Sequence, residues 1–213
     1  MAGRITSLSV QVHNPDRANV YLDGEFAFGL AMIEAAKLST GQFLTDADIE
    51  ALKQFDEGER AHESALNLLS YRPRSEQEVR RRLGRKGFSE PAIEQAVQRL
   101  LRARLLDDEA FARYWISNRE QFRPRGAFAL RQELRRKGVS HRIIDGLLED
   151  VDEAENAYQA ATKRLTRWQR MDPSERQRRL FGYLQRRGFS YDVIRDVWER
   201  LLAEELIDQP END

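Results

Sequence analysis

The sequence contains no cysteine, only three histidines, and few residues that break helices. Its 213 residues include 12 glycines and 6 prolines. Without cysteine the chain can form neither a disulfide nor a thiolate site, which is consistent with a reducing compartment. No apolar run approaches the roughly 20 residues that a membrane-spanning helix needs, and the N-terminus shows no signal-peptide core. We therefore expect a cytoplasmic protein that does not associate with membranes.

Motifs for catalysis and for cofactor binding are also missing. The histidines, His13, His62 and His141, are far apart in the sequence, and no Cys or His cluster has metal-ligand spacing. No glycine-rich loop precedes a Lys-Ser or Lys-Thr pair, so a nucleotide-phosphate site is unsupported. A Gly-x-Ser-x-Gly nucleophile motif is absent as well. We expect a protein that is not an enzyme and that carries no metal and no other cofactor.

Charge is plentiful and strongly segregated along the chain. Charged residues make up 33% of the sequence, yet the formal net charge is −1. Residues 72–104 carry 10 basic and 4 acidic side chains, residues 119–142 carry 8 and 2, and residues 143–162 carry 6 acids and no base. Such alternation suggests a surface that faces a polyanion or another protein. The alternative is a set of solvated helices whose opposite charges pair, and charge alone leaves both interpretations open.

An internal repeat of about fifty residues is centred on Gly87, Gly138 and Gly188, which are 51 and 50 residues apart. Each glycine follows two basic residues and precedes a Phe or Val and then a serine. Apolar residues recur eight and four positions before it and six, ten and thirteen positions after it. Agreement at this many positions in three copies indicates three structurally similar units.

The chemistry of a helix–helix junction explains this pattern. Each glycine follows a helix and can adopt the left-handed conformation that ends it. In the first copy, Leu83 and Phe88 then occupy the two positions that touch in a Schellman cap. Ser89 is expected to cap the next helix, and Phe88 with Ile93 forms a hydrophobic staple. One apolar side chain thus fixes the angle between two helices.

We predict a mainly α fold, in which tandem three-helix repeats form an elongated, curved helical array preceded by a small N-terminal β meander. Strands are expected near residues 5–12, 20–22 and 26–28, and helices near 31–37 and 45–70. Ser75 with Glu78 and Ser174 with Gln177 are typical of capping boxes, and Asp107 or Asp108 can begin a third helix. The predicted divisions are an N-terminal extension at 1–60, repeat 1 at 61–119, repeat 2 at 120–171, and repeat 3, without its third helix, at 172–213.

Basic side chains of the first two repeats are the candidate binding residues. Cations in the last turn of a helix stabilise it by about 0.3–1 kcal/mol, which explains part of the basic surplus. Others lie where the helix dipole disfavours them, and most are arginines, which suit bidentate contacts with phosphate or carboxylate groups. The candidates are Arg72, Arg74, Arg81, Arg82, Arg85, Lys86, Arg119, Arg123, Arg125, Arg131, Arg135 and Lys137.

Several motifs in this order resemble the core signature of the RecX regulatory proteins. They are Arg72-Pro73-Arg74-Ser75, Leu83-x-x-Lys86-Gly87-Phe88, Leu106-Asp107-Asp108-x-x-Phe111-Ala112-x-x-Trp115, Arg119, Gly126 and Leu134-x-x-Lys137-Gly138-Val139. The resemblance implies a regulator that lies along the RecA filament on DNA and limits its ATPase, strand-exchange and co-protease activities, in homologous recombination and the SOS response. The expected partners are the RecA filament and DNA, single-stranded or within the filament, and we expect the protein itself to be a monomer.

Two alternatives belong to other functional classes. One is a stand-alone DNA-binding protein, such as a transcriptional regulator that uses one helix pair as a helix-turn-helix. The other is a structural adaptor in which every charged face is merely solvated. The threefold occurrence of the same junction argues against the first, because a regulator needs one recognition helix and usually a dimer interface.

Overall fold

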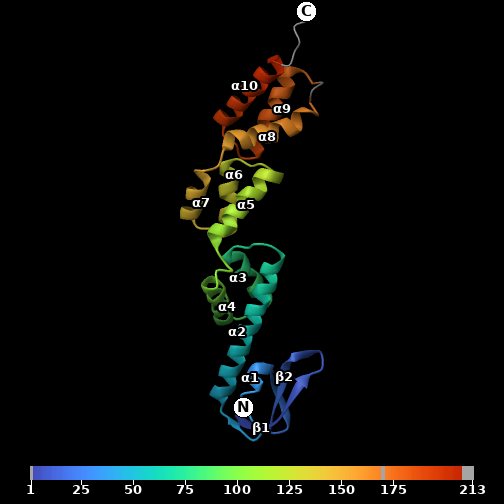
Figure 1. Ribbon diagram of the computed structural model, residues 1–213, viewed down its shortest axis with the longest axis vertical. Coiled ribbons are helices and arrows are strands. Elements are labelled where there is room, and N and C mark those ends of the chain that lie inside the picture. Colours follow the sequence, from blue (N-terminus) through green and yellow to red (C-terminus); the bar gives the residue numbers. More distant parts are fainter. Residues whose placement is uncertain (1, 169–170, 208–213) are drawn as a thin grey trace, which may run out of the picture. The chain divides into compact units, whose positions relative to one another are not determined.

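The computed structural model describes residues 2–168 and 171–207, and most of its helices and strands are labelled in Figure 1. The strands are β1 (Gly3–Gln11), β2 (Asn14–Leu22), β3 (Glu25–Ala31) and β4 (Phe43–Leu44). The helices are α1 (Met32–Ala35), α2 (Asp46–Tyr71), α3 (Glu76–Arg85), α4 (Glu90–Arg102), α5 (Asp108–Phe122), α6 (Ala127–Arg136), α7 (His141–Leu148), α8 (Glu153–Leu165), α9 (Pro173–Arg186) and α10 (Tyr191–Ile207). The mainly helical class with an N-terminal sheet is confirmed.

The chain forms two compact units, which are described separately. Unit 1 comprises residues 1–72 and 79–106, and unit 2 comprises residues 73–78 and 107–213. The first turn of α3 therefore belongs to unit 2, and the rest of α3 belongs to unit 1. None of the described helices combines the length and the hydropathy that crossing a bilayer requires.

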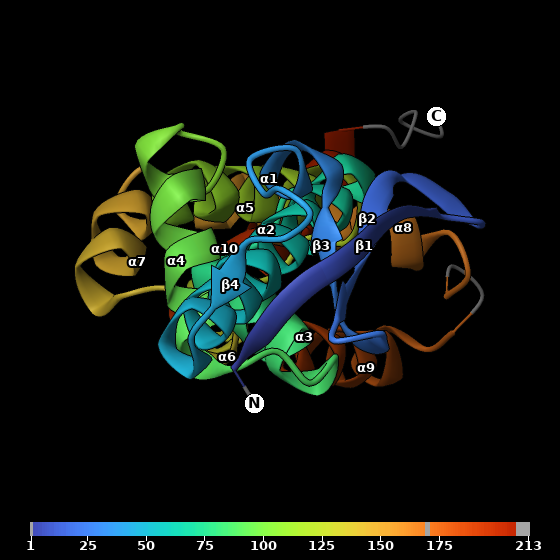
Figure 2. The same cartoon turned by 90° about the horizontal axis from the view of Figure 1, so that it is seen from below.

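An antiparallel sheet with the strand order β3-β2-β1-β4 begins unit 1. The short strand β4 pairs with the start of β1, and Figure 2 shows it near the N-terminal end of that strand. Asp23 and Gly24 both have positive φ, 50° and 92°, which the tight turn between β2 and β3 requires. The meander was predicted, but β2 begins at Asn14, inside the expected turn, and the two-residue strand β4 was missed.

A buried carboxylate connects this sheet to α2. Asp56 accepts a hydrogen bond from Arg17 Nη2 of β2 at 2.7 Å and another from the backbone N–H of Ala31 at 3.1 Å. Its side chain is almost fully buried, so both contacts are needed to offset the loss of water. The same helix supplies Ile49 to the core of the sheet and Ala61 to the core of the helices that follow.

Three hydrophobic cores divide the helices into triads. In unit 1, α2, α3 and α4 share a core that includes Ala65, Leu83 and Leu100. In unit 2, α5, α6 and α7 share a second core, and α8, α9 and α10 share a third. Each core thus contains three consecutive helices. The middle helix of each triad, α3, α6 or α9, is the one that a repeat glycine follows. The sequence-based boundaries at 60, 119 and 171 remain a proposal, and residues 208–213 of the last division lie outside the described residues.

The glycine caps are confirmed in all three copies. Gly87, Gly138 and Gly188 have φ of 86°, 86° and 85°. The N–H of the following residue donates to the carbonyl of the leucine four positions before each glycine, at 3.4, 3.2 and 3.3 Å. The glycine N–H donates to the carbonyl three positions back, at 3.0, 2.9 and 2.9 Å, which completes the Schellman pattern.

The serine caps are only partly confirmed. Ser89 and Ser140 occupy the N-cap positions, but neither side chain caps its helix. The backbone N–H and the hydroxyl of Ser89 both donate instead to Glu57 of α2. The predicted box of Ser174 and Gln177 is wrong, because the N-cap lies two residues earlier, at Asp172, which accepts from the N–H groups of Ser174 and Glu175. A carboxylate one position before the proline is the better acceptor for these groups.

Within unit 2, two glycine caps pack against the starts of helices. Gly138 lies against Gln77 in the first turn of α3, and Ser75 donates to the carbonyl of Lys137. Gly188 lies against Ala129 in the first turn of α6, and the N–H of Gly126 donates to the carbonyl of Arg187 at 3.0 Å. Ser75 and Gly126 occupy the same repeat position, 51 residues apart. The same contact therefore occurs twice in unit 2, and we call it the cap-to-start contact. In it a capping glycine packs against the first turn of another helix, and the carbonyl before that glycine accepts a hydrogen bond from the residue that precedes the helix.

Acidic residues of other helices cap the same starts. The N–H of Glu76 donates to Asp108 Oδ1 at 2.8 Å, and the N–H of Ala127 donates to Glu153 Oε1 at 3.2 Å. Asp108 and Glu153 are the first residues of α5 and α8. Burial, opposed by the Glu76 hydrogen bond, raises the pKa of Asp108, and the nearby Glu76 and Asp107 carboxylates raise it further.

Replacing Gly126 by alanine should destabilise unit 2, although its φ of −71° suits any residue. A Cβ there would overlap the backbone of Gly188, and relieving such overpacking costs about 1–3 kcal/mol. Gly146→Ala in the middle of α7 is the matched control, because a Cβ meets open space there. We expect the control to gain about 0.5–1 kcal/mol. Urea unfolding measures both, and equal midpoints for the two variants would contradict the cap-to-start contact.

Replacing Asp108 by asparagine should change how stability depends on pH. Because the folded pKa of Asp108 is raised, its contribution favours folding at low pH and is lost as the pH rises from the unfolded to the folded pKa. Asparagine keeps an oxygen that can accept from Glu76 and does not titrate. The free energy of unfolding of Asp108→Asn relative to wild type should therefore increase through that interval, as measured by urea unfolding at a series of pH values. A constant difference would show that Asp108 titrates normally.

Candidate functional site

The twelve candidate residues divide equally by exposure. The exposed candidates are Arg81, Arg82, Arg85, Lys86, Arg123 and Arg135, and the half-buried ones are Arg72, Arg74, Arg119, Arg125, Arg131 and Lys137. Arg72, Arg81, Arg82, Arg85 and Lys86 belong to unit 1, and the other seven belong to unit 2. The contacts of each group decide which side chains are available to an outside partner.

The exposed candidates of unit 1 lie on α3 and on its glycine cap. Lys86 Nζ donates to Ser64 Oγ of α2 at 2.6 Å. Among the residues that the structure describes, Arg82 and Arg85 form no ion pair. These two guanidinium groups are therefore available for phosphate or carboxylate groups.

Three candidates of unit 2 converge on one indole ring and one carboxylate. Arg119 lies 4.3 Å and the Lys137 ammonium 4.0 Å from the centre of the Trp115 ring. Glu133 accepts from Trp115 Nε1 at 2.7 Å and from Arg119 Nε at 2.8 Å, and Arg125 Nε lies 3.6 Å from it. We call these five residues the Trp115 cluster.

The Trp115 cluster continues to the start of α3. Lys137 Nζ donates to Glu78 at 2.9 Å, within unit 2. The exposed fraction of both side chains is 17%, so water screens this pair only partly. Two carboxylates, Glu78 and Glu133, thus neutralise much of the charge of Arg119, Arg125 and Lys137. The main role of these three cations is therefore to connect α5, α6 and the start of α3.

An ion pair recurs at the same repeat position and was not anticipated. Arg80 of α3 pairs with Glu94 of α4 at 2.7 Å, and Arg131 of α6 pairs with Asp145 of α7 at 3.1 Å. Both pairs join the residue seven positions before the glycine to the one seven positions after it. The repeat alignment carried this signal, because both positions have matching charges in the two copies. Arg131 is therefore engaged within its own triad.

Arg187, which was not a candidate, forms two hydrogen bonds with the connector Arg123–Gly126 between α5 and α6. Its Nη1 donates to the carbonyl of Pro124 at 2.8 Å, and its own carbonyl accepts from the N–H of Gly126. Its guanidinium lies 4.8 Å from the centre of the Tyr183 ring. Burial is the main cause that lowers the pKa of Arg187 below its ordinary value, and Arg125, Arg164 and Arg123 lower it as well.

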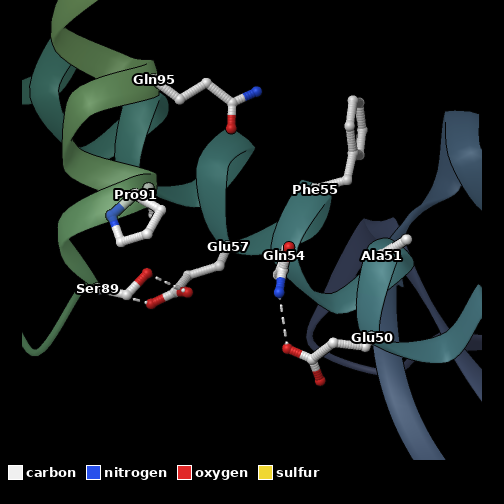
Figure 3. A pocket seen from close by; sticks show the side chains of 9 residues that line it. Glu50, Ala51, Gln54, Phe55, Glu57, Ser89, Pro91 and Gln95 are labelled. Atoms are coloured by element: carbon white, nitrogen blue, oxygen red, sulfur yellow. Dashed lines mark hydrogen bonds between the residues drawn. The ribbon is translucent and has the colours of Figure 1, made fainter. Parts of the chain in front are cut away.

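A shallow pocket of about 480 Å³ lies between α2 and α4 in unit 1. Figure 3 shows Glu57 of α2 directed at Ser89, with Gln54 hydrogen bonded to Glu50 on the other side. The Ser89 hydrogen bonds hold the pKa of Glu57 below its usual range. The pocket thus contains the Glu57–Ser89 hydrogen bonds, which join α2 to the start of α4. Among the described residues, no group of three His, Asp or Glu side chains has a metal-binding arrangement.

Replacing Glu133 by glutamine should destabilise unit 2, because it removes the charge that Arg119 and Arg125 face. Hydrogen bonds to charged groups contribute about 1.5–3 kcal/mol, and we expect a loss near the lower end of this range. Glu109→Gln is the control, since Glu109 pairs with Arg113 on an exposed face and such pairs contribute about 0.3–0.5 kcal/mol. Urea unfolding followed by tryptophan fluorescence tests both. Equal losses would mean that the Trp115 cluster is no stronger than a surface pair.

Comparison with known proteins places this repeat architecture in one family. Family models match residues 3–45 as the regulatory protein RecX N-terminal domain, and residues 61–100, 107–148 and 150–198 as the first, second and third three-helix domains of RecX. The matched helical domains coincide with the three cores, and each contains one glycine cap.

Individual relatives agree with the family models. Regulatory protein RecX of Bacillus subtilis (strain 168) is 32% identical over 202 residues, which cover 92% of this chain and 76% of that protein. The protein of the same name from Clostridium perfringens (strain 13) is 32% identical over 216 residues, covering 97% and 100%. A crystal structure of regulatory protein RecX superposes with a TM-score of 0.71 at 27% identity and covers 92% of this chain and 99% of that one. RecX from Lactobacillus salivarius superposes with a TM-score of 0.61 at 26% identity, covering 68% and 97%. With its glycine caps, its three helical cores and its N-terminal sheet, the chain belongs to the RecX family of regulatory proteins.

Proposed function

We propose that this protein binds the RecA recombinase filament on DNA and modulates it, mostly by inhibiting its ATPase, strand-exchange and co-protease activities. It acts by binding, and not by catalysis. The observation that carries the proposal is membership of the RecX family over the N-terminal domain and all three helical domains.

The distribution of available cations supports a partner that is itself charged. Arg82 and Arg85 in unit 1, and Arg123 and Arg135 in unit 2, are exposed and form no ion pair among the described residues. Guanidinium groups bind phosphate and carboxylate groups in a bidentate manner, so these four suit both DNA and an acidic protein surface. We assign them as the principal contacts among the twelve candidates, with Arg119, Arg125 and Lys137 in a supporting role inside the repeat.

Tandem repetition supports a polymeric partner rather than a single DNA site. The same glycine cap occurs in three triads, and an exposed arginine recurs two positions before the glycine, as Arg85, Arg136 and Arg186. Repeats that present similar groups at regular intervals suit a ligand that also repeats. A stand-alone transcriptional regulator would instead need one helix that differs from the others and reads base edges.

The protein should inhibit the DNA-dependent ATPase of RecA at a molar ratio well below one, because one molecule bound along a filament affects many subunits. ATP hydrolysis by RecA on a long single-stranded circle is the measurement, with this protein added in steps. A stand-alone regulator would not inhibit at low ratios, and a structural adaptor would have no effect. Either outcome would contradict the proposal.

Matched variants assign the inhibition to the available arginines. Arg82→Ala combined with Arg85→Ala should weaken inhibition severalfold with the helix content unchanged, since neither side chain forms an ion pair among the described residues. Arg113→Ala is the control, because Arg113 is also exposed but pairs with Glu109. Equal inhibition by the two variants would remove Arg82 and Arg85 from the interface.

A further inference from the structure

An exposed aromatic residue followed by Arg-Pro-Arg occurs twice at the same repeat position. The two copies are Tyr71-Arg72-Pro73-Arg74 and Phe122-Arg123-Pro124-Arg125, 51 residues apart. The exposed fraction of Tyr71 is 78% and that of Phe122 is 64%. Single exposed apolar residues are common on protein surfaces. An exposed aromatic ring with the same three neighbours in two repeats needs an explanation that packing does not supply.

The backbone that presents the second copy is fixed. Phe122 is the last residue of α5, and the N–H of Arg123 still donates to the carbonyl of Arg119 at 2.8 Å. Pro124 is buried, and its carbonyl accepts from Arg187 Nη1 at 2.8 Å. Gly126 closes the connector through its hydrogen bond to the carbonyl of Arg187. A ligand bound here would pay little to order the connector, which favours affinity.

Arginines gather around this connector. Arg164 of α8 and Arg187 lie 5.1 and 4.8 Å from the centre of the same Tyr183 ring. Arg187 also reaches the carbonyl between Arg123 and Arg125. Within residues 2–168 and 171–207, Arg123, Arg164 and Arg187 form no ion pair, and Arg125 has only the contact at 3.6 Å with Glu133. Two guanidinium groups therefore belong to the connector, and those of Arg164 and Arg187 flank the Tyr183 ring. The carboxylate of Glu133 faces Arg125, and that of Glu153 accepts from the backbone N–H of Ala127, just after the connector.

An exposed ring beside unneutralised guanidinium groups is the combination that binds single-stranded nucleic acid. Unpaired bases stack on aromatic side chains, and cations hold the phosphates between them. A duplex keeps its bases stacked on one another and offers no free base face to such a ring. Recurrence of the element after one repeat period also suits a chain of nucleotides, which presents the same groups at intervals.

We propose that the connector from Phe122 to Arg125 binds single-stranded nucleic acid directly, with Phe122 stacked on a base and Arg123 on an adjacent phosphate. This deepens the proposed function by naming its DNA contact, and it requires no recombinase. Arg164 and Arg187 contribute positive potential, and Arg187 also holds the connector in place through its two hydrogen bonds.

The test uses the full-length protein without RecA and two labelled oligonucleotides of equal length and charge, one of thymidines and one of abasic sites. Fluorescence anisotropy should show that wild type prefers the thymidine strand. Phe122→Ala should weaken thymidine binding about fivefold or more, the least that the loss of one stacked base predicts, and should leave abasic binding unchanged. Phe122→Trp should restore the preference, and Arg123→Ala should weaken both strands and reduce the salt dependence of binding.

Phe128→Ala is the matched control, because Phe128 is 65% exposed in the same unit but has glutamine, Gln77, at its position in the first repeat. It should bind both strands as wild type does. Equal wild-type affinity for the two strands, or unchanged thymidine binding by Phe122→Ala, overturns the inference. If Phe122→Ala loses RecA inhibition while its oligonucleotide binding is intact, Phe122 contacts the recombinase, which also overturns it. If the protein does not bind the oligonucleotides but still inhibits the RecA ATPase, this inference fails and the proposed function stands.

Discussion

The helical part of this protein depends on how closely a left-handed glycine lets the end of one helix approach the start of another. At Gly138 and Gly188 the missing Cβ allows the first turns of α3 and α6 to lie directly against the cap. The carbonyls of the preceding residues, Lys137 and Arg187, then accept hydrogen bonds from those turns. At Gly87 a Cβ would meet open space, so this cap is needed only for the turn itself. The same motif thus ends a helix in unit 1 and also joins helices in unit 2.

The basic residues have two distinct roles, which the net charge of −1 conceals. Lys137 and Arg187 precede the capping glycines and turn inward, where each lies against an aromatic ring and reaches the neighbouring helix start. Arg82, Arg85 and Arg123 are exposed and keep their charge for a partner. Since burying an unpaired cation is costly, Lys137 requires the carboxylate of Glu78, and Arg187 donates to the backbone carbonyl of Pro124. The binding contacts proposed above belong to the exposed group.

Much of the fold could be predicted because its signals are local. The left-handed glycines, the leucine carbonyls that accept the cap hydrogen bonds and the Asp107 cap of α5 all follow from a few consecutive residues. The Trp115 cluster could not be predicted, because its members come from different helices whose facing sides the sequence does not state. The Arg131–Asp145 pair was signalled only by the matching charges of Arg80 and Glu94 at the same repeat positions. Asp172 was missed because the serine after Pro173 offered an equally plausible cap. The sequence showed which segments are rich in arginine and lysine. It could not show which of these side chains form ion pairs within a triad, and those pairs decide which cations remain available to a partner.

Amide hydrogen exchange at Gly126 tests the central claim most directly. In the cap-to-start contact this N–H donates to the carbonyl of Arg187, across two helices of unit 2. Exposed amides exchange without an opening step, whereas amides held by tertiary contacts exchange only when the structure opens. The account predicts that the Gly126 amide is protected to the same degree as the buried amides of Leu130 and Leu134 in α6. Exchange at the rate of an unstructured peptide would contradict it.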